Sequence, residues 1–419
     1  MTHLERFTGL AERLAEWQSL WRCLPFQHPR LPWQARWPGL AEALLALTDA
    51  EVARLQEDPF TDSPLAAWLP VDELAWLVAL PAMAEQGGVL AEELPEAWGE
   101  QVGGRKWRQV QAFLPQVEVA QAESLVEWCA GKGHLARALS RHHGIEVTAL
   151  EWQPALCEAG RALAQRQGAR VTLREQDVMA ENAAAWLDDR TRVAALHACG
   201  DLHRRLLTLA EAAGSAVTLA PCCYQRTADD RYRPLSTRGR ALAEARGLVL
   251  ERDDLALAVQ ETVTAPRGVQ RHRERAGAWR LGFDRLQREV RGVDAYLPVP
   301  SLAYGQMPET FEGFCHWAAQ QKGIALPAGV DWRAHEDAGW RRQREVARLE
   351  LARHLFRRPW RYGWRWIVRP SWRRPAMRWS SAPSVPGSSP LATWCCAGAS
   401  VETPVVAARF PRCPGSVKV

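Results

Sequence analysis

The sequence predicts an α/β protein in which a helical N-terminal domain precedes a parallel sheet flanked by helices. Two observations predict this class. Apolar side chains recur at helical spacing in the first hundred or so residues, and from about Val117 short apolar runs alternate with Ala-rich helical stretches. The second pattern is typical of parallel sheets covered by helices. Such sheets bind ligands beyond the carboxyl ends of their strands, so functional residues are expected there.

Helices are expected throughout residues 1–104, the predicted N-terminal domain. Thr48 and Glu51 have the spacing of a capping box at the start of one helix. No residue in this domain suggests chemistry, and its tryptophans are predicted to lie in the core. The first helix is indicated by six apolar residues at helical spacing: Leu4, Phe7, Leu10, Leu14, Trp17 and Trp21.

Five strands are expected in the sheet domain, which is predicted to span residues 105–300 with a C-terminal helical part at residues 301–358. Each candidate strand ends in polar or small residues, which is typical of strand ends that contact a ligand. The candidates are SLVEWCAG, EVTALEW, VTLREQD, RVAALHACG and AVTLAPCCY.

The first strand leads into a glycine-containing loop, VEWCAGKGHLA. Gly131 and Gly133 let backbone N–H groups approach a ligand closely, and Glu151 at the second strand end is placed to accept both hydroxyls of a ribose. These features predict a nucleoside-binding half-site. Gly131, Gly133 and Ala136 also satisfy the dinucleotide pattern G-x-G-x-x-G/A, so a nicotinamide-dependent oxidoreductase is an alternative.

Carboxylates at three successive strand ends favour a different cofactor. Glu127, just before the loop, suits the amino-acid end of S-adenosylmethionine and would be unfavourable beside a pyrophosphate. Asp177, at the third strand end, offers an acceptor for an adenine amino group. Together with Glu151 they fit a cofactor that has an ammonium, a ribose and an adenine but no phosphate.

Three motifs together resemble the class I S-adenosylmethionine-dependent methyltransferases of the methyltransferase-like type. They are VEWCAGKGHLARAL, LHACGDLHRRLL and LAPCCYQ, and the last two are also similar to motifs of a eukaryotic tRNA ribose methyltransferase family. The resemblance covers residues 105–225 and implies a Rossmann-like sheet, although Cys129 stands where many such enzymes have a glycine. It implies cofactor contacts at Glu127, Ala130, Gly131, Gly133, Glu151 and Asp177.

The same resemblance places residues 197–202 and 222–224 beside the methyl group. His197 or Asp201 could take a proton from the acceptor, and Tyr224 could stack on a base or orient it. A His197 that is only hydrogen-bonded below the pocket is an equal alternative. The shared motifs make RNA the first expected acceptor, before a protein or a small molecule. A non-catalytic S-adenosylmethionine-binding module in an RNA-associated assembly is a further alternative.

Cys222 and Cys223 admit three interpretations. A buried structural pair is favoured over a thiolate nucleophile that attacks a pyrimidine ring. A metal site is the third, because His197, Cys199 and His203 converge on neighbouring strand ends. No metal is predicted, since adjacent cysteines on one strand point to opposite faces.

The composition is that of a folded protein, with 419 residues of which 47% are apolar and 24% charged. The N-terminus has no signal-peptide core, and prolines and acids interrupt the longest apolar run, residues 65–84. We therefore expect a cytoplasmic protein with reduced cysteines and no membrane partner. The net charge of +5 comes from residues 359–419, which hold nine basic residues and one acid, Glu402; the remainder has a net charge of −3.

Residues 359–419 are expected to be an aberrant, unstructured tail that is read out of frame. The family's chain should continue here into a Leu-rich helix, a strand and a final strand that opens with Ser/Thr-Pro-Arg-Asn, but this segment is rich in Trp, Arg, Pro and Ser. Trp has the single codon TGG, so a frame one base earlier converts each Trp into Leu, Val or Met. Back-translated in this way, residues 360–398 contain Thr-Pro-Arg-Asn. The sheet is therefore predicted to lack its last two strands, which leaves an open edge.

Overall fold

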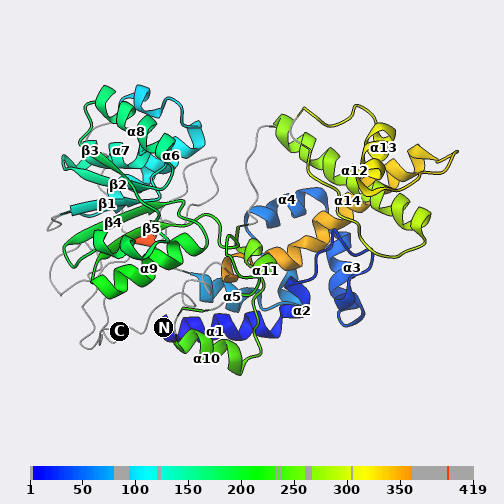
Figure 1. The fold of residues 1–419 in the computed structure, drawn as a ribbon. Helices are drawn as coiled ribbons and strands as arrows, with labels where there is room; N and C mark the ends of the chain where they lie inside the picture. The colour runs from blue at the N-terminus through cyan, green and yellow to red at the C-terminus, as the bar shows by residue number, and fades with distance from the viewer. Residues whose placement is uncertain are drawn as a thin grey trace. The chain divides into compact units, whose positions relative to one another are not determined.

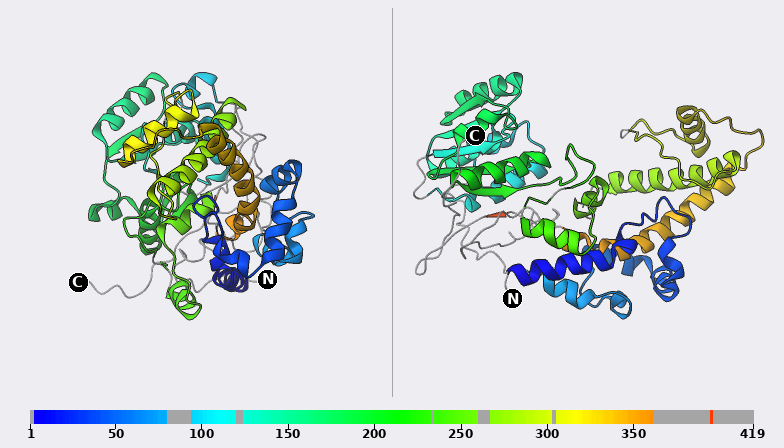
Figure 2. Two further views of the ribbon diagram at one scale, coloured as in Figure 1. Left: turned by 90° about the vertical axis from the view of Figure 1, so that its right-hand side faces the viewer. Right: turned by 60° about the horizontal axis from the view of Figure 1, so that its bottom comes forward.

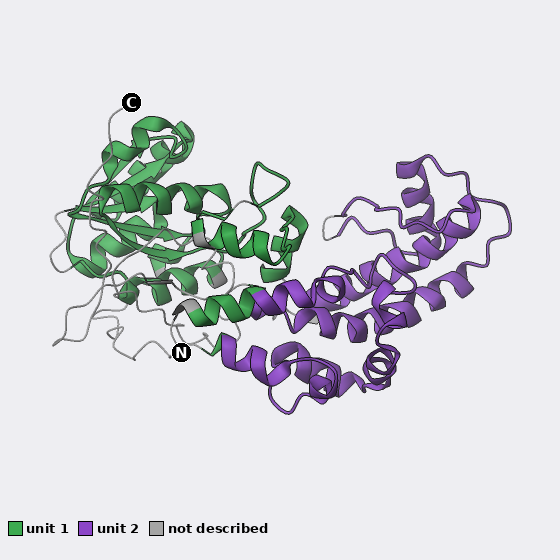
Figure 3. Cartoon of the chain, turned by 90° about the horizontal axis from the view of Figure 1, so that it is seen from below, with its two compact units in different colours: residues 1–11, 78–260, 360–419 green, residues 12–77, 261–359 purple. Residues whose placement is uncertain are grey.

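The computed structural model divides into two compact units (Figure 3). The sheet unit comprises residues 1–11, 78–260 and 360–419, and the helical unit comprises residues 12–77 and 261–359. These units cut across the predicted boundaries, because residues 301–358 pack with N-terminal helices instead of with the sheet. The structure describes residues 3–79, 94–119, 124–232, 234–235, 237–259, 267–302, 305–360 and 394–395.

A parallel sheet forms the centre of the sheet unit, with strand order β3-β2-β1-β4-β5-β6 (Figure 1). All five predicted strands are confirmed, and their neighbours pair in parallel. The order reverses between β1 and β4, and ligands of such sheets bind beyond the carboxyl ends of the strands at this reversal. The strands are β1 (Ser124–Trp128), β2 (Val147–Glu151), β3 (Val171–Glu175), β4 (Thr191–Leu196), β5 (Ala216–Ala220) and β6 (Trp394–Cys395).

Helices cover both faces of this sheet (Figures 1 and 2). Successive residues of one strand enter different cores: Leu125 packs in the cluster with α6, α7 and α8, whereas Val126 packs in the cluster with α9. Burial on both faces explains why the strands read as nearly continuous apolar runs. The helices of this unit are α6 (Gly104–Phe113), α7 (His134–His143), α8 (Pro154–Arg166), α9 (Asp201–Ala213), α10 (Thr237–Ala245) and α11 (Arg252–Ala256).

The edge of the sheet differs from the prediction. Thr218 and Leu219 of β5 pair antiparallel with Cys395 and Trp394 of β6, so the predicted open edge is wrong at these positions. In the shifted reading frame Thr-Pro-Arg-Asn falls directly before β6, where the family's final strand is expected. The rest of the predicted out-of-frame tail, from residue 361 onward, lies outside the described residues.

The helical unit is built from two distant stretches of the chain. Helix α14 packs on α12 and also on α2, α3 and α4, while α12 and α13 enclose an aromatic core around Phe283 and Phe314. Gly339 permits close contact of α14 with α12, because a Cβ there would lie 2.2 Å from the carbonyl oxygen of Ala278. The helices are α2 (Gln18–Trp21), α3 (Pro38–Ala46), α4 (Asp49–Glu57), α12 (Arg267–Arg291), α13 (Phe311–Lys322) and α14 (Trp332–His354); α1 (His3–Glu16) and α5 (Val71–Val78) span the division between the units.

Local predictions in the N-terminal helices are largely confirmed. The capping box is present, since Thr48 Oγ1 accepts from the Glu51 N–H at 3.3 Å and Glu51 Oε2 accepts from the Thr48 N–H at 2.7 Å. Trp21 is buried, but Trp76 is 58% exposed, so the tryptophans are not uniformly part of the core. Short 3-10 helices complete the chain: Pro32–Ala35, Pro64–Ala67, Glu96–Gly99, Leu114–Gln116, Glu181–Trp186 and Leu257–Val259.

No helix within the described ranges combines the length and the apolar character needed to cross a membrane.

Candidate active site

The loop between β1 and α7 is open to a ligand. Gly131 and Gly133 have φ of +59° and +66°, and a Cβ on Gly131 would meet no heavy atom within 4 Å. Cys129 adopts φ of +61°, a conformation that non-glycine residues seldom take. The Ala130 N–H donates to the Leu150 carbonyl at 2.9 Å and ties the loop to β2. The loop therefore has the fixed shape and free space expected of a cofactor cradle.

Glu151, at the end of β2, is hydrogen-bonded to this loop. Its Oε2 accepts from the Gly131 N–H at 2.8 Å, and its Oε1 accepts from the Gln153 N–H at 3.0 Å. A carboxylate has about four lone-pair positions, so each oxygen keeps capacity for one further donor. A buried carboxylate with this remaining capacity suits the pair of hydroxyls on a ribose.

Glu127, in β1, is a buried acid at the N-terminus of α7. Its side chain is 5% exposed, and its Oε2 accepts from the Ala136 N–H at 2.8 Å. Burial raises the pKa of Glu127 to about 8, although the hydrogen bond from Ala136 and the charges of Lys106 and Arg137 act in the opposite direction. A further cation beside this carboxyl would return it to the charged form.

Asp177 follows β3 and is exposed, with Oδ1 accepting from the Met179 N–H at 2.9 Å. Its position is set by Gln176, whose side-chain amide donates to the Asp177 carbonyl and to Asn182 Oδ1 and accepts from the Trp186 indole. The Gln176 N–H also donates to the Glu151 carbonyl at 2.9 Å.

The three predicted acids lie around the β1–α7 loop: Glu151 and Glu127 accept from the N–H groups of Gly131 and Ala136, and Asp177 follows Gln176, which donates to the Glu151 carbonyl. Burial is the main cause that raises the pKa of the Cys129 thiol to about 12, and the charges of Glu151, Glu127, Cys199 and Asp177 add to it. The structure therefore brings the predicted cofactor residues together around one loop.

His197 follows β4 and contacts Gln109, a residue that the sequence motifs did not identify. His197 Nε2 lies 2.9 Å from Oε1 of Gln109 in α6, and its backbone N–H donates to the Ala220 carbonyl at 3.0 Å. An amide oxygen accepts only, so Nε2 of His197 is the donor in this contact, which orients the imidazole.

Asp201, at the start of α9, holds the loop that follows β5. Its Oδ1 pairs with Arg204 at 2.7 Å, and its Oδ2 accepts from the Ala228 N–H at 2.7 Å. The neighbouring Gly200 has φ of +59°, and a Cβ there would lie 1.6 Å from the Arg226 carbonyl oxygen. Because these two contacts join the start of α9 to the loop after β5, the geometry suits a positioning role for Asp201.

Tyr224 is 2% exposed and meets the ring of His203 edge to face, with centroids 6.1 Å apart. Its ring is thus packed in the protein and offers no open face for a base, contrary to the stacking role considered from the sequence. His203 is also buried, and burial lowers its pKa to about 3, so this imidazole is neutral.

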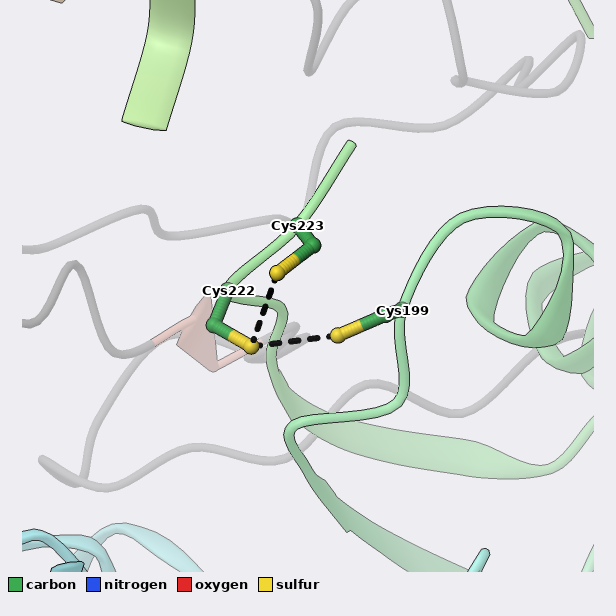
Figure 4. A group of neighbouring side chains, drawn as sticks. All are labelled: Cys199, Cys222 and Cys223. Atoms are coloured by element: carbon green, nitrogen blue, oxygen red, sulfur yellow. Dashed lines mark hydrogen bonds between the residues drawn. The ribbon is translucent and has the colours of Figure 1, made fainter. Parts of the chain in front are cut away.

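Three cysteines meet at the ends of β4 and β5 (Figure 4). Sγ of Cys222 lies 3.1 Å from Sγ of Cys199 and 3.6 Å from Sγ of Cys223. The prediction that Cys222 and Cys223 diverge is wrong, because β5 ends at Ala220 and strand alternation does not extend into the loop. The hydrogen bond from the Cys222 thiol lowers the pKa of Cys199, and the same contact raises the pKa of Cys222.

Comparison with known proteins agrees with this fold. Residues 105–230 match the model of a family described as a methyltransferase domain. No curated protein matches the chain. The match supports a methyltransferase domain that uses S-adenosylmethionine, and it favours this assignment over the nicotinamide alternative.

Solved structures that match part of this chain include three methyltransferases. An RNA methyltransferase from Salinibacter ruber in complex with S-adenosyl-L-homocysteine is 21% identical, with a TM-score of 0.24, and the match covers 30% of this chain and 81% of that one. Precorrin-6y C5,15-methyltransferase from Geobacter metallireducens is 16% identical, with a TM-score of 0.25, and the match covers 29% of this chain and 66% of that one. The third is the complex between the Haloferax volcanii Trm112 methyltransferase activator and the putative methyltransferase. It is 19% identical, with a TM-score of 0.24, and the match covers 34% of this chain and 62% of that one. The matches thus span less than two thirds of the last two chains.

Proposed function

We propose that this chain transfers the methyl group of S-adenosylmethionine to an RNA acceptor. The main observation for binding of the methyl donor is the hydrogen bond from the Gly131 N–H to Glu151 Oε2. In this proposal the remaining lone pairs of Glu151 accept the ribose hydroxyls, Glu127 faces the ammonium of the cofactor, and Asp177 accepts from the adenine amino group.

The transfer itself needs few protein groups. The acceptor lone pair forms a bond to the methyl carbon while the S–CH3 bond breaks, and the sulfonium becomes a neutral thioether. The acceptor proton must leave, and the base in this proposal is the imidazole of His197, which Gln109 orients. Asp201 acts indirectly, because it fixes the loop after β5 through Ala228.

An RNA acceptor is supported by two features. The segments at residues 197–202 and 222–224, which resemble motifs of a tRNA ribose methyltransferase family, are joined by the hydrogen bond from the Gly200 N–H to the Cys223 carbonyl. Helix α6 carries Gln109 toward His197 and exposes Lys106 and Arg108 to solvent, where they would contact phosphates. The charge that favours RNA therefore lies on α6, in the same unit as the site.

Transfer of a labelled methyl group from S-adenosylmethionine into fractionated lysate tests the proposal. The lysate comes from cells that lack the gene, and RNA, protein and small molecules are counted separately. We expect label in RNA with the native protein and its loss with His197→Ala, while calorimetry shows that His197→Ala still binds the cofactor. Label in protein or small molecules would contradict the RNA acceptor. Cofactor binding without label in any fraction would instead identify a non-catalytic binding module.

A further inference from the structure

The cysteine cluster at the ends of β4 and β5 is held by the backbone. Cys199 lies in the loop after β4, and Cys222 and Cys223 lie in the loop after β5. The His197 N–H donates to the Ala220 carbonyl at 3.0 Å, and the Gly200 N–H donates to the Cys223 carbonyl at 2.8 Å. These two bonds flank the cysteines, so the two loops are fixed against each other on both sides of the three sulfurs.

The separations of the sulfurs match those of a tetrahedral thiolate site. A Zn–S bond of about 2.3 Å requires sulfurs about 3.8 Å apart in a tetrahedron. Two observed separations, from Cys222 to Cys199 and to Cys223, are 3.1 and 3.6 Å, and all three ligand atoms lie within 4.8 Å of one another. Shifts of a few tenths of an ångström to about one ångström would therefore bring the sulfurs into a metal's first coordination sphere.

We propose that Cys199, Cys222 and Cys223 bind one zinc ion through three thiolates. The imidazoles considered from the sequence have other contacts, since His197 meets Gln109 and His203 packs edge to face on Tyr224. Among the described residues these cysteines form the group of ligand atoms able to hold a metal. Three protein ligands leave a fourth position for water or a substrate atom, which is the arrangement of catalytic and not of structural zinc sites.

The chemistry of the cluster agrees with this site. Metal ligands must be deprotonated, so zinc binding at this cluster would release the thiol protons. Three thiolates and Zn2+ carry a net charge of −1, so a thiol or other soft nucleophile in the fourth position would keep its electron density. Zinc binding goes beyond the proposed methyl transfer and does not depend on it.

Metal content and cobalt substitution of the full chain test the site. The protein is purified under reducing conditions, stripped with a chelator and reloaded with Zn2+ or Co2+ alone. We expect one zinc per chain after gel filtration, and with Co2+ the intense near-ultraviolet absorption of thiolate-to-cobalt charge transfer. Cys199→Ser, Cys222→Ser and Cys223→Ser should each weaken zinc binding at least about tenfold in competition with a chromophoric chelator. The matched control is Cys23→Ser, at a buried thiol of the helical unit, which should leave binding unchanged.

Three results would overturn the site. The first is no zinc retained by the native chain while all three thiols react with a thiol reagent. The second is equal loss of zinc in Cys23→Ser. The third is a Cys199–Cys222 disulfide in protein prepared without oxidant. Because a serine variant can fail to fold, the cobalt spectrum of the native chain gives an independent reading, and its absence also counts against the site. Calorimetry with S-adenosylmethionine on the stripped chain separates the two proposals, since retained cofactor binding leaves methyl transfer intact when zinc binding fails.

Discussion

Glu127→Gln should change how the stability of the sheet unit depends on pH. The glutamine keeps the size of the side chain, and its Oε1 can still accept from the Ala136 N–H that Glu127 accepts at 2.8 Å. What the substitution removes is the ionisation of a carboxyl that is 5% exposed. The comparison therefore isolates the cost of a buried charge from the effects of packing.

The magnitude follows from the raised pKa. The carboxyl titrates at about 8 in the folded cofactor-free protein and at the ordinary 4.5 when unfolded, with burial as the main cause. The folded state binds more protons between these values, so the contribution of Glu127 is fully present below pH 4.5 and is lost as the pH rises through 8. Each pKa unit corresponds to about 1.4 kcal/mol, so the whole loss is about 5 kcal/mol. The glutamine variant should match the native protein near pH 4.5 and exceed its stability above pH 8.

Denaturant-dependent hydrogen exchange of β1 and α7 amides at several values between pH 5 and 9 would measure this difference. Glu175→Gln is the matched control, because Glu175 also lies near the carboxyl end of a strand of the sheet but is exposed. A difference between Glu127→Gln and the native protein that stays constant over this range, or an equal trend in the control, would refute the reasoning.

Three further substitutions test other contacts. Glu151→Ala should weaken S-adenosylmethionine binding at least about tenfold in calorimetry, because it removes the partner of the Gly131 N–H and the acceptor proposed for the ribose; unchanged affinity would contradict that role. His197→Ala should lower kcat by about 10²- to 10⁴-fold and abolish the acidic limb of the pH–rate profile, because a general base loses activity when it is protonated. Asp201→Asn should lower kcat without changing the profile, so similar profiles would contradict the separate roles. Arg353→Met should lower the free energy of unfolding of the helical unit by about 1–3 kcal/mol, because the buried Arg353 Nε donates to the Trp21 carbonyl at 2.8 Å. The control is Arg333→Met, at an exposed position of the same helix. Equal stability of the two variants would show that this hydrogen bond contributes nothing.

The strands, and the acids near their carboxyl ends, could be predicted because their signals are local. A strand covered on both faces has few polar positions, and the first residues that break its apolar run mark its end. Glu127, Glu151 and Asp177 were found in this way, and the convergence of parallel strand ends supplied the rest of the argument.

Contacts between distant segments could not be predicted. Gln109 meets His197 across 88 residues of sequence, and neither residue type nor spacing indicates the pair. The alternation rule failed for Cys222 and Cys223 because it was applied two residues beyond the end of β5. In the helical unit the sequence shows which segments are amphipathic, but an apolar helix face does not specify its partner, so the packing of α14 on N-terminal helices was missed.

The split helical unit imposes an order on synthesis. Residues 12–77 emerge from the ribosome first, yet their partners at 261–359 follow only after the sheet segment 78–260 has been made. At about 5–20 residues per second this delay is roughly 10 to 40 s. Throughout that interval α14 has not been synthesised, so the faces of α3 and α4 that later contact it remain uncovered by this helix, while the sheet segment has time to fold. The nascent chain is therefore exposed to aggregation at its beginning until its C-terminal helices arrive, and a ribosome-associated chaperone would find its target there.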